Sequence, residues 1–527
     1  MYERSSQQIP KGWIETTLNE IALWGSGGTP SRKNNKFYRG SIPWVKTGEL
    51  GPKYIRSAQE YITQEGIQRS SAKVFPKGSV GIAMYGATIG KLSIWGADLS
   101  TNQACAVAQP CLEILSSEFL YYFLLSQRYA LIEAGKGGAQ PNISQGLLKD
   151  WPICLPPIDE QCRIVDKIEE LFSELDKGIE SLKTARGQLK VYRQAVLKHA
   201  FEGKLTEQWR EENKNKLETP ERLRTRIKKE REKRYQQQLD QWKTAVKTWE
   251  VEGKKGRKPR KPGLLEQPEV ITSNETKSLP KIPSAWCFVR LCEITDIGSG
   301  MSVNNSRKID NPIKVPYLRV ANVQRGFLDL SEVKHMTIEM SQLDSMALKQ
   351  WDILFNEGGD RDKLGRGWIW QSKIMPCITQ NHVFRASPYF PSKEHSTLIS
   401  HWGNTFGQRY FEEMGKQTTN LASINKTVLS EFPVPLMSID EQEEICKQID
   451  SMMTLINAQL DEISAVLEKS TTLRQAILRS AFSGKLIPQD PNDEPASILL
   501  ERIRAEKTEQ EKTHGKSSRR KTGEVIV

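Results

Sequence analysis

The sequence lacks the features that would place the protein in a membrane, in an oxidising compartment or around a metal ion. No stretch approaches the roughly 18 consecutive apolar residues that a membrane-spanning helix needs, and the polar first ten residues do not form the apolar core of a secretory signal. None of the eight cysteines forms a C-x-x-C pair, and the six histidines form no H-E-x-x-H set. We therefore expect a cytoplasmic protein without a metal site.

Motifs of DNA-modifying enzymes are also missing. Asn311–Lys314 lacks the second proline and the aromatic residue of a methyltransferase Asn-Pro-Pro-aromatic motif. Gly86–Leu92 has three residues instead of four between its glycines, and Leu92 stands where a phosphate loop has Ser or Thr. Asp360 and Asp362 lack the strand that precedes the paired carboxylates of a nuclease. The sequence thus predicts a chain with no catalytic residues of its own.

Positive charge is concentrated in one segment. The formal net charge is +12, and residues 206–262 hold 19 Lys or Arg against 10 Asp or Glu, which is +9 of that total. A basic surplus favours nucleic acid as a partner, because lysine and arginine neutralise phosphate. We expect a helix from Pro220 to about Trp249, followed by a mobile basic tether, Gly253–Pro262, that cannot pack a core. This segment is either a solvated linker or a DNA contact, and the sequence leaves both readings open.

The chain contains an internal duplication. Trp151–Gln161 and Phe432–Gln442 both end in Ile-Asp-Glu-Gln. The match continues without a gap to Arg193–Leu205 and Arg474–Leu486, at a constant separation of 281 residues. Repeated segments of this length do not arise by chance.

The openings of the two halves also correspond. Ile9–Trp13 matches Ile282–Trp286, and Gly25–Gly27 matches Gly298–Gly300, at a separation of 273 residues. The change from 273 to 281 means that the second copy has gained eight residues in its middle. Each half is therefore a domain of about 150 residues with a repeated frame and different contents, followed by a nearly constant helical segment.

Both helical segments carry a heptad pattern. Apolar residues recur in steps of four and three at Ile164, Ile168, Leu171, Leu175, Ile179, Leu182, Leu189, Tyr192 and Val196, and at Ile445, Ile449, Met452, Ile456, Leu460, Ile463, Leu473 and Ile477. This spacing is typical of a coiled-coil seam. Each helix could pack on its own domain instead, but two such stripes in one chain favour pairing, and the intervening domain makes the pair antiparallel. Helices of about forty residues would span roughly 60 Å.

The variable middle of each domain is rich in side chains that suit DNA. Arginine and lysine bind phosphate or the guanine edge, and asparagine and glutamine pair with adenine. The candidates in the first domain are Thr29, Ser31, Arg32, Lys33, Lys36, Lys46, Thr47, Tyr85, Thr88, Lys91, Asn102 and Gln103. Those in the second are Ser302, Arg307, Arg319, Asn322, Asn356, Arg361, Lys363, Gln380 and Asn381. Any one of them, taken singly, is more often an ordinary turn residue.

The paired Ile-Pro-x-x-Trp openings, the Gly-Ser-Gly loops, and the repeated Ile-Asp-Glu-Gln and Gly-Lys-Leu elements resemble the specificity subunits of type I restriction-modification systems. The resemblance covers essentially residues 9 to 505. It implies two target recognition domains, each reading one half of a split DNA sequence, with the helices as the spacer between them. It also implies two methyltransferase subunits and translocase-nuclease subunits as partners. S-adenosylmethionine, ATP and magnesium would then belong to those partners and not to this chain.

The expected fold class is accordingly α+β, with two α/β recognition domains alternating with two long helices that pair as an antiparallel coiled coil. The expected boundaries are 1–150 and 280–431 for the recognition domains, 151–205 and 432–487 for the helices, 206–279 for the charged insert and 488–527 for a charged tail. Three alternatives remain at this point: partnership with a related single-polypeptide enzyme, a protein-binding coiled-coil scaffold, and a self-sufficient DNA enzyme.

Overall fold

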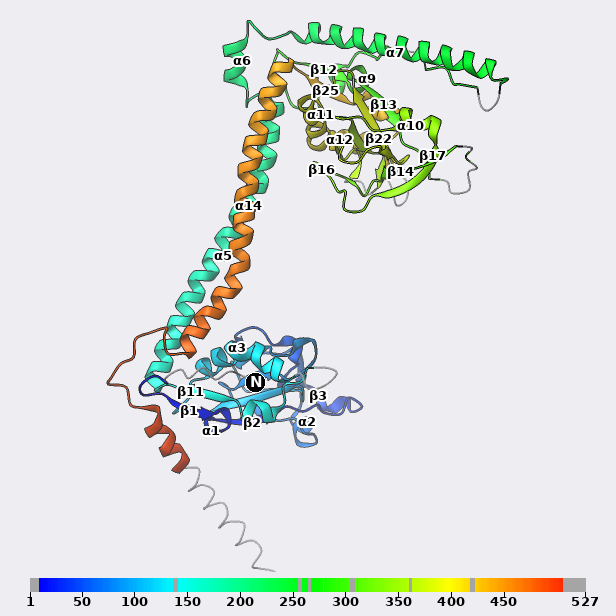
Figure 1. Ribbon diagram of the computed structural model, residues 1–527. Coiled ribbons are helices and arrows are strands. Elements are labelled where there is room, and N and C mark those ends of the chain that lie inside the picture. The colour runs from blue at the N-terminus through cyan, green and yellow to red at the C-terminus, as the bar shows by residue number, and fades with distance from the viewer. Residues whose placement is uncertain are drawn as a thin grey trace, which may run out of the picture. The chain divides into compact units, whose positions relative to one another are not determined.

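The computed structural model describes residues 9–135, 141–254, 258–263, 267–277, 279–303, 309, 311–359, 363–417 and 422–505. The chain divides into two compact units (Figure 1). The first unit comprises Met1–Thr184 with Ile463–Val527, and the second comprises Ala185–Glu462. Each unit therefore contains one end of each long helix together with one of the duplicated domains. No helix among the described residues is long and apolar enough to cross a membrane.

The first domain is built from two small sheets and a strand pair. Its strands are β1 (Ile14–Thr17), β2 (Ala22–Ser26), β3 (Tyr38–Val45), β4 (Tyr54–Ile55), β5 (Glu60–Ile62), β6 (Val74–Phe75), β7 (Val80–Ala83), β8 (Leu92–Trp95), β9 (Leu99–Thr101), β10 (Cys105–Pro110) and β11 (Pro152–Leu155). They form sheets in the orders β2-β10-β7-β8-β4 and β5-β3-β9-β6, and β1 pairs with β11. The helices are α1 (Leu18–Ile21), α2 (Gln64–Gln68), α3 (Ser117–Ala134) and α4 (Gln145–Lys149), with 3-10 turns η1 (Asn35–Phe37), η2 (Thr47–Glu49) and η3 (Gly86–Thr88).

Helix α3 covers the larger sheet of this domain. The Ser116 side chain caps its first turn by accepting from the Phe119 amide (3.0 Å). Phe119, Leu120 and Leu124 are fully buried in the core that α3 shares with β7 and β8. Because every side chain of β8 is buried, this strand is covered on both faces.

The second domain has the same kind of architecture. Its strands are β12 (Cys287–Arg290), β13 (Thr295–Ser299), β14 (Pro312–Leu318), β15 (Val323–Gln324), β16 (Phe327–Leu328), β17 (Lys334–Glu339), β18 (Ile353–Asn356), β19 (Gly358–Gly359), β20 (Gly367–Ile369), β21 (Ile378–Thr379), β22 (Val383–Pro388), β23 (Lys416–Gln417), β24 (Ala422–Ser423) and β25 (Pro433–Leu436). Its helices are α9 (Leu291–Ile294), α10 (Leu343–Met346), α11 (Lys393–Thr405), α12 (Gly407–Met414) and α13 (Lys426–Glu431), with the turn η4 (Met340–Gln342). The main sheets have the orders β13-β22-β18-β20 and β17-β14-β21.

The strand registers repeat the duplication seen in the sequence. Ile14 pairs with Leu155 in the first domain, and Cys287 pairs with Leu436 in the second. These partners are separated by the same 273 and 281 residues. A parallel pair also recurs, because β3 lies beside β9 and β14 lies beside β21.

A glycine at the same place in each domain explains why the Gly-Ser-Gly element is repeated. A Cβ atom on Gly27 would lie 2.1 Å from the Thr101 carbonyl oxygen, and one on Gly300 would lie 2.2 Å from that of Gln380. Only glycine allows the backbone to approach this closely. Both loops are thereby held against the turn that precedes β10 or β22.

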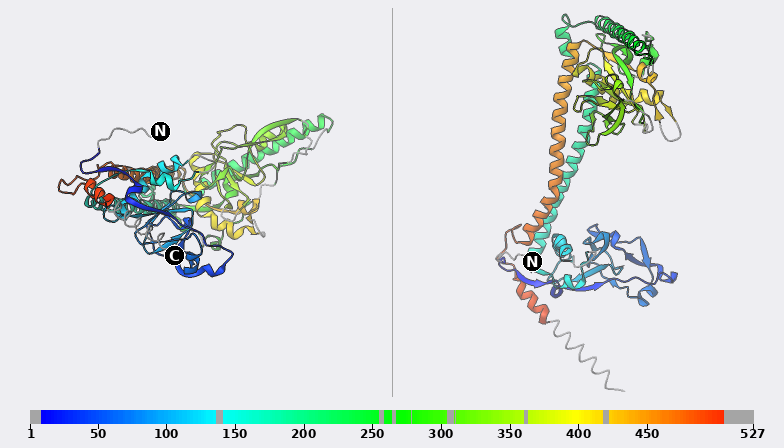
Figure 2. Two further views of the ribbon diagram at one scale, coloured as in Figure 1. Left: turned by 90° about the horizontal axis from the view of Figure 1, so that it is seen from below. Right: turned by 45° about the vertical axis from the view of Figure 1, so that its right-hand side comes forward.

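Two helices of 44 residues, α5 (Ile158–Phe201) and α14 (Ile439–Phe482), follow the two domains. In the first unit, Arg474 of α14 lies over the Phe172 ring of α5, with its guanidinium carbon 4.8 Å from the ring centroid. In the second unit, Leu197 near the end of α5 shares a core with Ile445 near the start of α14. In each unit the two helices lie side by side (Figures 1 and 2). The start of one helix is beside the end of the other, which confirms the antiparallel pairing expected from the heptads.

The buried seam is narrower than the heptad spacing predicts. Ile168 and Ile456 are buried as expected, but Tyr192 and Leu473 are 52% and 49% exposed. The side chains of Val191, Leu455 and Val466 are also exposed on the two helices. Apolar surface is therefore left open to solvent along the pair.

The charged insert contains α6 (Glu207–Asn213), α7 (Pro220–Val251) and α8 (Ser273–Thr276). Helix α7 matches the expected helix from Pro220 to about Trp249. The expectation of an unpacked tether over Gly253–Pro262 is wrong for its last described part, because the indole nitrogen of Trp242 donates to the Pro259 carbonyl (3.0 Å). Aromatic residues on α7 give this basic segment a surface to pack on.

Candidate nucleic-acid interface

The loop that follows β2 in the first domain carries most of the predicted DNA-contact residues. Its start is fixed, because the Gly28 amide donates to the Thr101 carbonyl (2.8 Å) and the Trp44 indole donates to the Gly28 carbonyl (3.0 Å). The Tyr38 hydroxyl donates to the Pro30 carbonyl. Beyond these anchors, the predicted residues Ser31, Lys33 and Lys36 are exposed. The sequence thus forms a loop with a fixed base and a polar, accessible tip.

Arg32 and Lys46 form one cluster through Glu60. Arg32 donates to the Glu60 carboxylate (2.7 Å), and Lys46 donates to the other oxygen of that carboxylate. The Arg32 guanidinium also lies over the rings of Tyr38 and Trp44, at 4.6 and 5.1 Å from their centroids. Hydrogen bonds from Lys46 and Arg32 lower the pKa of Glu60. This carboxylate therefore stays ionised and holds two cations in place, one of them stacked on aromatic faces.

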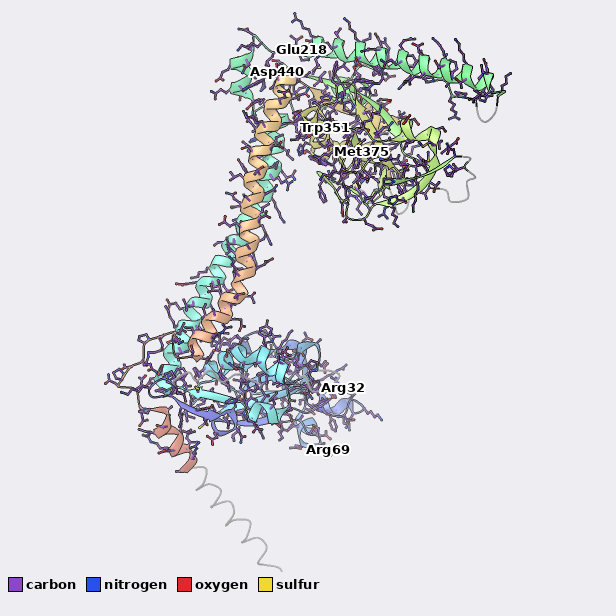
Figure 3. The ribbon with its side chains drawn as sticks, viewed as in Figure 1. Arg32, Arg69, Glu218, Trp351, Met375 and Asp440 are labelled. Carbon is purple, nitrogen blue, oxygen red and sulfur yellow. The ribbon has the colours of Figure 1, made fainter. Side chains whose placement is uncertain are left out.

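An open groove of about 670 Å³ lies beside this cluster. It is lined by Arg32, Asn35, Tyr38, Arg39, Gly40, Gln59, Glu60 and Tyr61, and Arg32 is labelled in Figure 3. The lining offers both hydrogen-bond donors and acceptors. Such a set can bind base edges and phosphates, but it contains no paired nucleophile and general base.

The remaining first-domain candidates come together at the same edge of the sheets. The Thr29 hydroxyl donates to the side-chain oxygen of Gln103, and the Met84 amide donates to the Ala104 carbonyl (2.8 Å), which places Tyr85 next to that turn. The Thr101 hydroxyl donates to the Val45 carbonyl (2.7 Å) at the end of β3. Asn102 belongs to this turn, Thr47 follows β3 in the half-buried turn η2, and Thr88 and Lys91 are half-buried in the loop after β7. Four loops thus converge on one surface.

The second domain brings a smaller set together at the corresponding edge. The Gln380 amide donates to the Leu318 carbonyl (2.9 Å), and the Asn381 amide donates to the Met301 carbonyl (3.0 Å). Arg319 follows β14 at this edge, and Ser302 is exposed next to Met301. Lys363 is half-buried in the loop before β20. The other two candidates of this domain, Arg307 and Arg361, lie outside the described residues.

Two predicted contacts require correction. Asn322 and Asn356 are 3% and 0% exposed. The Asn322 amide donates to the carbonyls of Asp329 and Glu332 (2.9 and 2.8 Å), and the Asn356 amide donates to the Val323 carbonyl (3.0 Å). Both side chains brace loops from inside the domain, so we withdraw them from the set of DNA-contact residues.

Glutamate and glutamine of the repeated Ile-Asp-Glu-Gln element have a structural role that the sequence did not reveal. Glu441 is buried and accepts from the Trp286 indole (2.8 Å) and the Thr206 hydroxyl (2.8 Å), and it lies 3.3 Å from Arg210. This contact replaces half of the expected capping box, because the Glu441 amide donates to Ser438 (3.3 Å) while its carboxylate turns away to Trp286.

The glutamine next to it holds the recognition domain. In the first unit, the Gln161 amide nitrogen donates to the Ile114 carbonyl (2.7 Å), and its oxygen accepts from the Ser116 amide (3.0 Å) at the start of α3. In the second unit, Gln442 contacts the His395 ring (2.9 Å) on α11. The recurrence of the motif together with the Ile-Pro-x-x-Trp element was the available signal. Both elements belong to the junction between a long helix and its domain.

Metal-binding geometry was also considered. Among the described residues, no group of three or more His, Cys, Asp or Glu side chains is placed to hold a metal ion. Burial raises the pKa of the Cys105, Cys377 and Cys446 thiols to about 12. These thiols are therefore protonated at neutral pH and are poor nucleophiles.

Known proteins show where this arrangement occurs. Residues 10–183 match the family described as the type I restriction modification DNA specificity domain. The chain is 24% identical over 522 residues to the type I restriction enzyme EcoDI specificity subunit of Escherichia coli, covering 95% of this chain and 97% of that protein. The chain belongs to the specificity subunits of type I restriction enzymes. The EcoR124I/EcoR124II specificity subunit of Escherichia coli is 30% identical to it over 203 residues, 36% of this chain and 50% of that protein.

Solved structures support the fold of this specificity subunit. A chain from a type I restriction-modification system has a TM-score of 0.57 at 18% identity and covers 91% of this chain and 100% of its own length. The HsdS subunit from Thermoanaerobacter tengcongensis has a TM-score of 0.55 at 18% identity, with coverage of 92% and 99%. The α+β class with two long helices is thus confirmed.

Proposed function

We propose that this specificity subunit reads a two-part DNA sequence, with one half-site bound by each recognition domain. The supporting observation is the polar edge that recurs on the repeated strand frame. Lys46, Asn102 and Gln103 lie at this edge in the first domain, where Arg319, Gln380 and Asn381 lie in the second. The constant frame preserves the fold, and the different polar groups would select different bases.

The chemistry is proposed to come from partner subunits. Two methyltransferase subunits and the translocase-nuclease subunits would assemble on this chain, and they would hold S-adenosylmethionine, ATP and magnesium. The exposed apolar side chains of α5 and α14, among them Val191, Tyr192 and Leu455, are suitable for such docking, because isolated surface helices do not need them for folding. Copurification would distinguish separate subunits from a related single-polypeptide enzyme.

Mapping methylated adenines by long-read sequencing, in cells with and without this chain, tests the proposal. We expect methylation that depends on the chain and occurs at one split motif. Replacing residues 1–150 with the first domain of another family member should change one half of that motif and leave the other. A contiguous motif, or a change in both halves, would contradict the proposal. The absence of any sequence-dependent methylation or binding would favour a protein-binding scaffold.

A further inference from the structure

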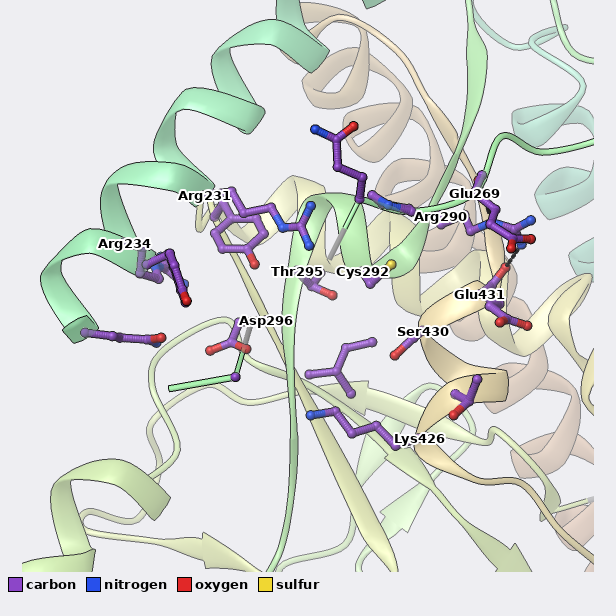
Figure 4. A pocket seen from close by; sticks show the side chains of 18 residues that line it. Arg231, Arg234, Glu269, Arg290, Cys292, Thr295, Asp296, Lys426, Ser430 and Glu431 are labelled. Atoms are coloured by element: carbon purple, nitrogen blue, oxygen red, sulfur yellow. Dashed lines mark hydrogen bonds between the residues drawn. The ribbon is translucent and has the colours of Figure 1, made fainter. Parts of the chain in front are cut away.

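Among the described residues, helix α7 contacts the second domain through its first half. Leu223 and Ile227 are buried against that domain. Further along, the Arg234 guanidinium carbon lies 5.0 Å from the Tyr389 ring centroid. Figure 4 shows Arg231 and Arg234 on this stretch, beside a cavity of about 830 Å³. The direction of α7 is therefore set by contacts made before its midpoint.

The second half of α7 has an apolar stripe of its own. Its members are half-buried and spaced by three, four and three residues: Leu239, Trp242, Val246 and Trp249. The returning segment packs against this stripe through the hydrogen bond from the Trp242 indole to the Pro259 carbonyl (3.0 Å). Lys261 lies 5.9 Å from the Trp242 ring centroid, and Lys258 lies 5.9 Å from that of Trp249. We call residues 239–254 and 258–262 together the basic arm.

The basic arm displays many cations and few carboxylates. Its exposed cations are Lys243, Lys247, Lys254, Lys258, Arg260 and Lys261, and its acidic residues are Asp240, Glu250 and Glu252. Lys243 pairs with Asp240 (3.0 Å). Because the returning segment packs on the indoles, the arm presents mainly charge to solvent. An interface with another protein normally needs an apolar centre, so this surface suits a polyanion better.

We propose that the basic arm binds the sugar-phosphate backbone of duplex DNA outside the bases read by the recognition domains. The proposal rests on the DNA-reading function proposed above. Lysine is a point charge that neutralises phosphate without reading base identity. The arm therefore adds affinity that is independent of sequence and sensitive to salt.

The test replaces Lys258, Arg260 and Lys261 with glutamine in the reconstituted methyltransferase complex. Binding is measured at several salt concentrations to two long duplexes, one with the mapped split motif and one with it scrambled. We expect about a tenfold loss of affinity for both duplexes. Each lost phosphate contact should reduce the slope of log affinity against log salt by about 0.9. The methylated motif should stay the same.

A matched control removes the same charge elsewhere in the second unit. Lys204, Lys214 and Lys216 are exposed lysines outside the arm, and their replacement with glutamine should leave the salt slope unchanged. An equal change in this control would overturn the proposal, because net charge alone would then explain the effect. An unchanged slope in the arm variant, or loss of the methyltransferase subunit on copurification, would also overturn it.

A second variant tests the geometry of the arm. Trp242→Ala keeps every cation but removes the indole that donates to Pro259. We expect a smaller loss of affinity than in the triple variant, equal on both duplexes. A loss confined to the motif duplex would contradict a backbone role. If instead the unaltered complex fails to distinguish the two duplexes, the proposed function has failed, and not the arm alone.

Discussion

The two recognition domains share their strand registers but differ in how they organise charge at the equivalent edge. In the first domain, Glu60 holds Arg32 and Lys46 together. In the second, Glu357 instead contacts the His382 ring (2.7 Å), and Arg319 lies 3.4 Å from Glu332. The frame is thus set by buried residues and close glycines, while exposed ion pairs vary on it. Specificity can change on this frame without a change of fold.

The largest effect is expected at the junction, where the two units differ. Glu441 has the nearby cation Arg210, and both side chains are at most 10% exposed. Glu441→Ala would leave this arginine buried without its carboxylate, at a cost of about 3–5 kcal/mol in the free energy of unfolding. Urea unfolding followed by tryptophan fluorescence measures the change.

Glu160→Ala, at the equivalent position of the first unit, is the matched control. Burial raises the pKa of Glu160, so its charged form is disfavoured in the folded state. The contribution of a carboxylate with a raised pKa falls as the pH rises above about 4.5. We therefore expect a smaller loss of stability at neutral pH than for Glu441→Ala. An equal loss in both variants would show that the arginine is not the cause of the difference.

The next effect concerns the reading of one half-site. Arg32→Ala removes the stacked guanidinium and should cost about 1–3 kcal/mol of discrimination in the first half of the motif. Arg319→Ala is the counterpart and should affect the second half only. Binding of duplexes mutated in one half at a time provides the measurement. If either variant relaxes both halves, the domains do not read independently.

Asn356 and Asn381 sharpen the distinction between frame and reading surface within one domain. Asn356→Ala removes a buried hydrogen bond to the Val323 carbonyl and should cost about 1–3 kcal/mol of stability, with the motif unchanged. Asn381→Ala lies at the exposed edge and should alter the motif with little loss of stability. Thermal unfolding and methylation mapping on the same two variants compare these outcomes. The reverse result would return Asn356 to the DNA-contact set.

The sequence predicted the duplication, the antiparallel helices and the edge of each domain that carries polar loops, because heptads and repeated motifs depend on local spacing. It did not separate Asn322 and Asn356 from Asn381, since an asparagine that braces a loop and one that faces solvent have the same local signature. Glu60 was missed for a related reason. Its importance comes from contacts with Arg32 and Lys46, which are 28 and 14 residues away in the sequence.

The smallest effect is expected from the pH dependence of the Glu60 cluster. Hydrogen bonds from Lys46 and Arg32 lower the pKa of Glu60, so its contribution is present above the ordinary value near 4.5 and is lost as the pH falls through the lowered value. The groove is open and the Arg32 side chain is 53% exposed, which keeps the effect on stability small. Glu60→Gln should remove this pH dependence, as measured by acid titration of unfolding. A control at Glu332, whose side chain is 71% exposed beside Arg319, should leave it in place. If both variants behave alike, the two cations do not select Glu60, and the difference between the domains would lie in their uncharged side chains.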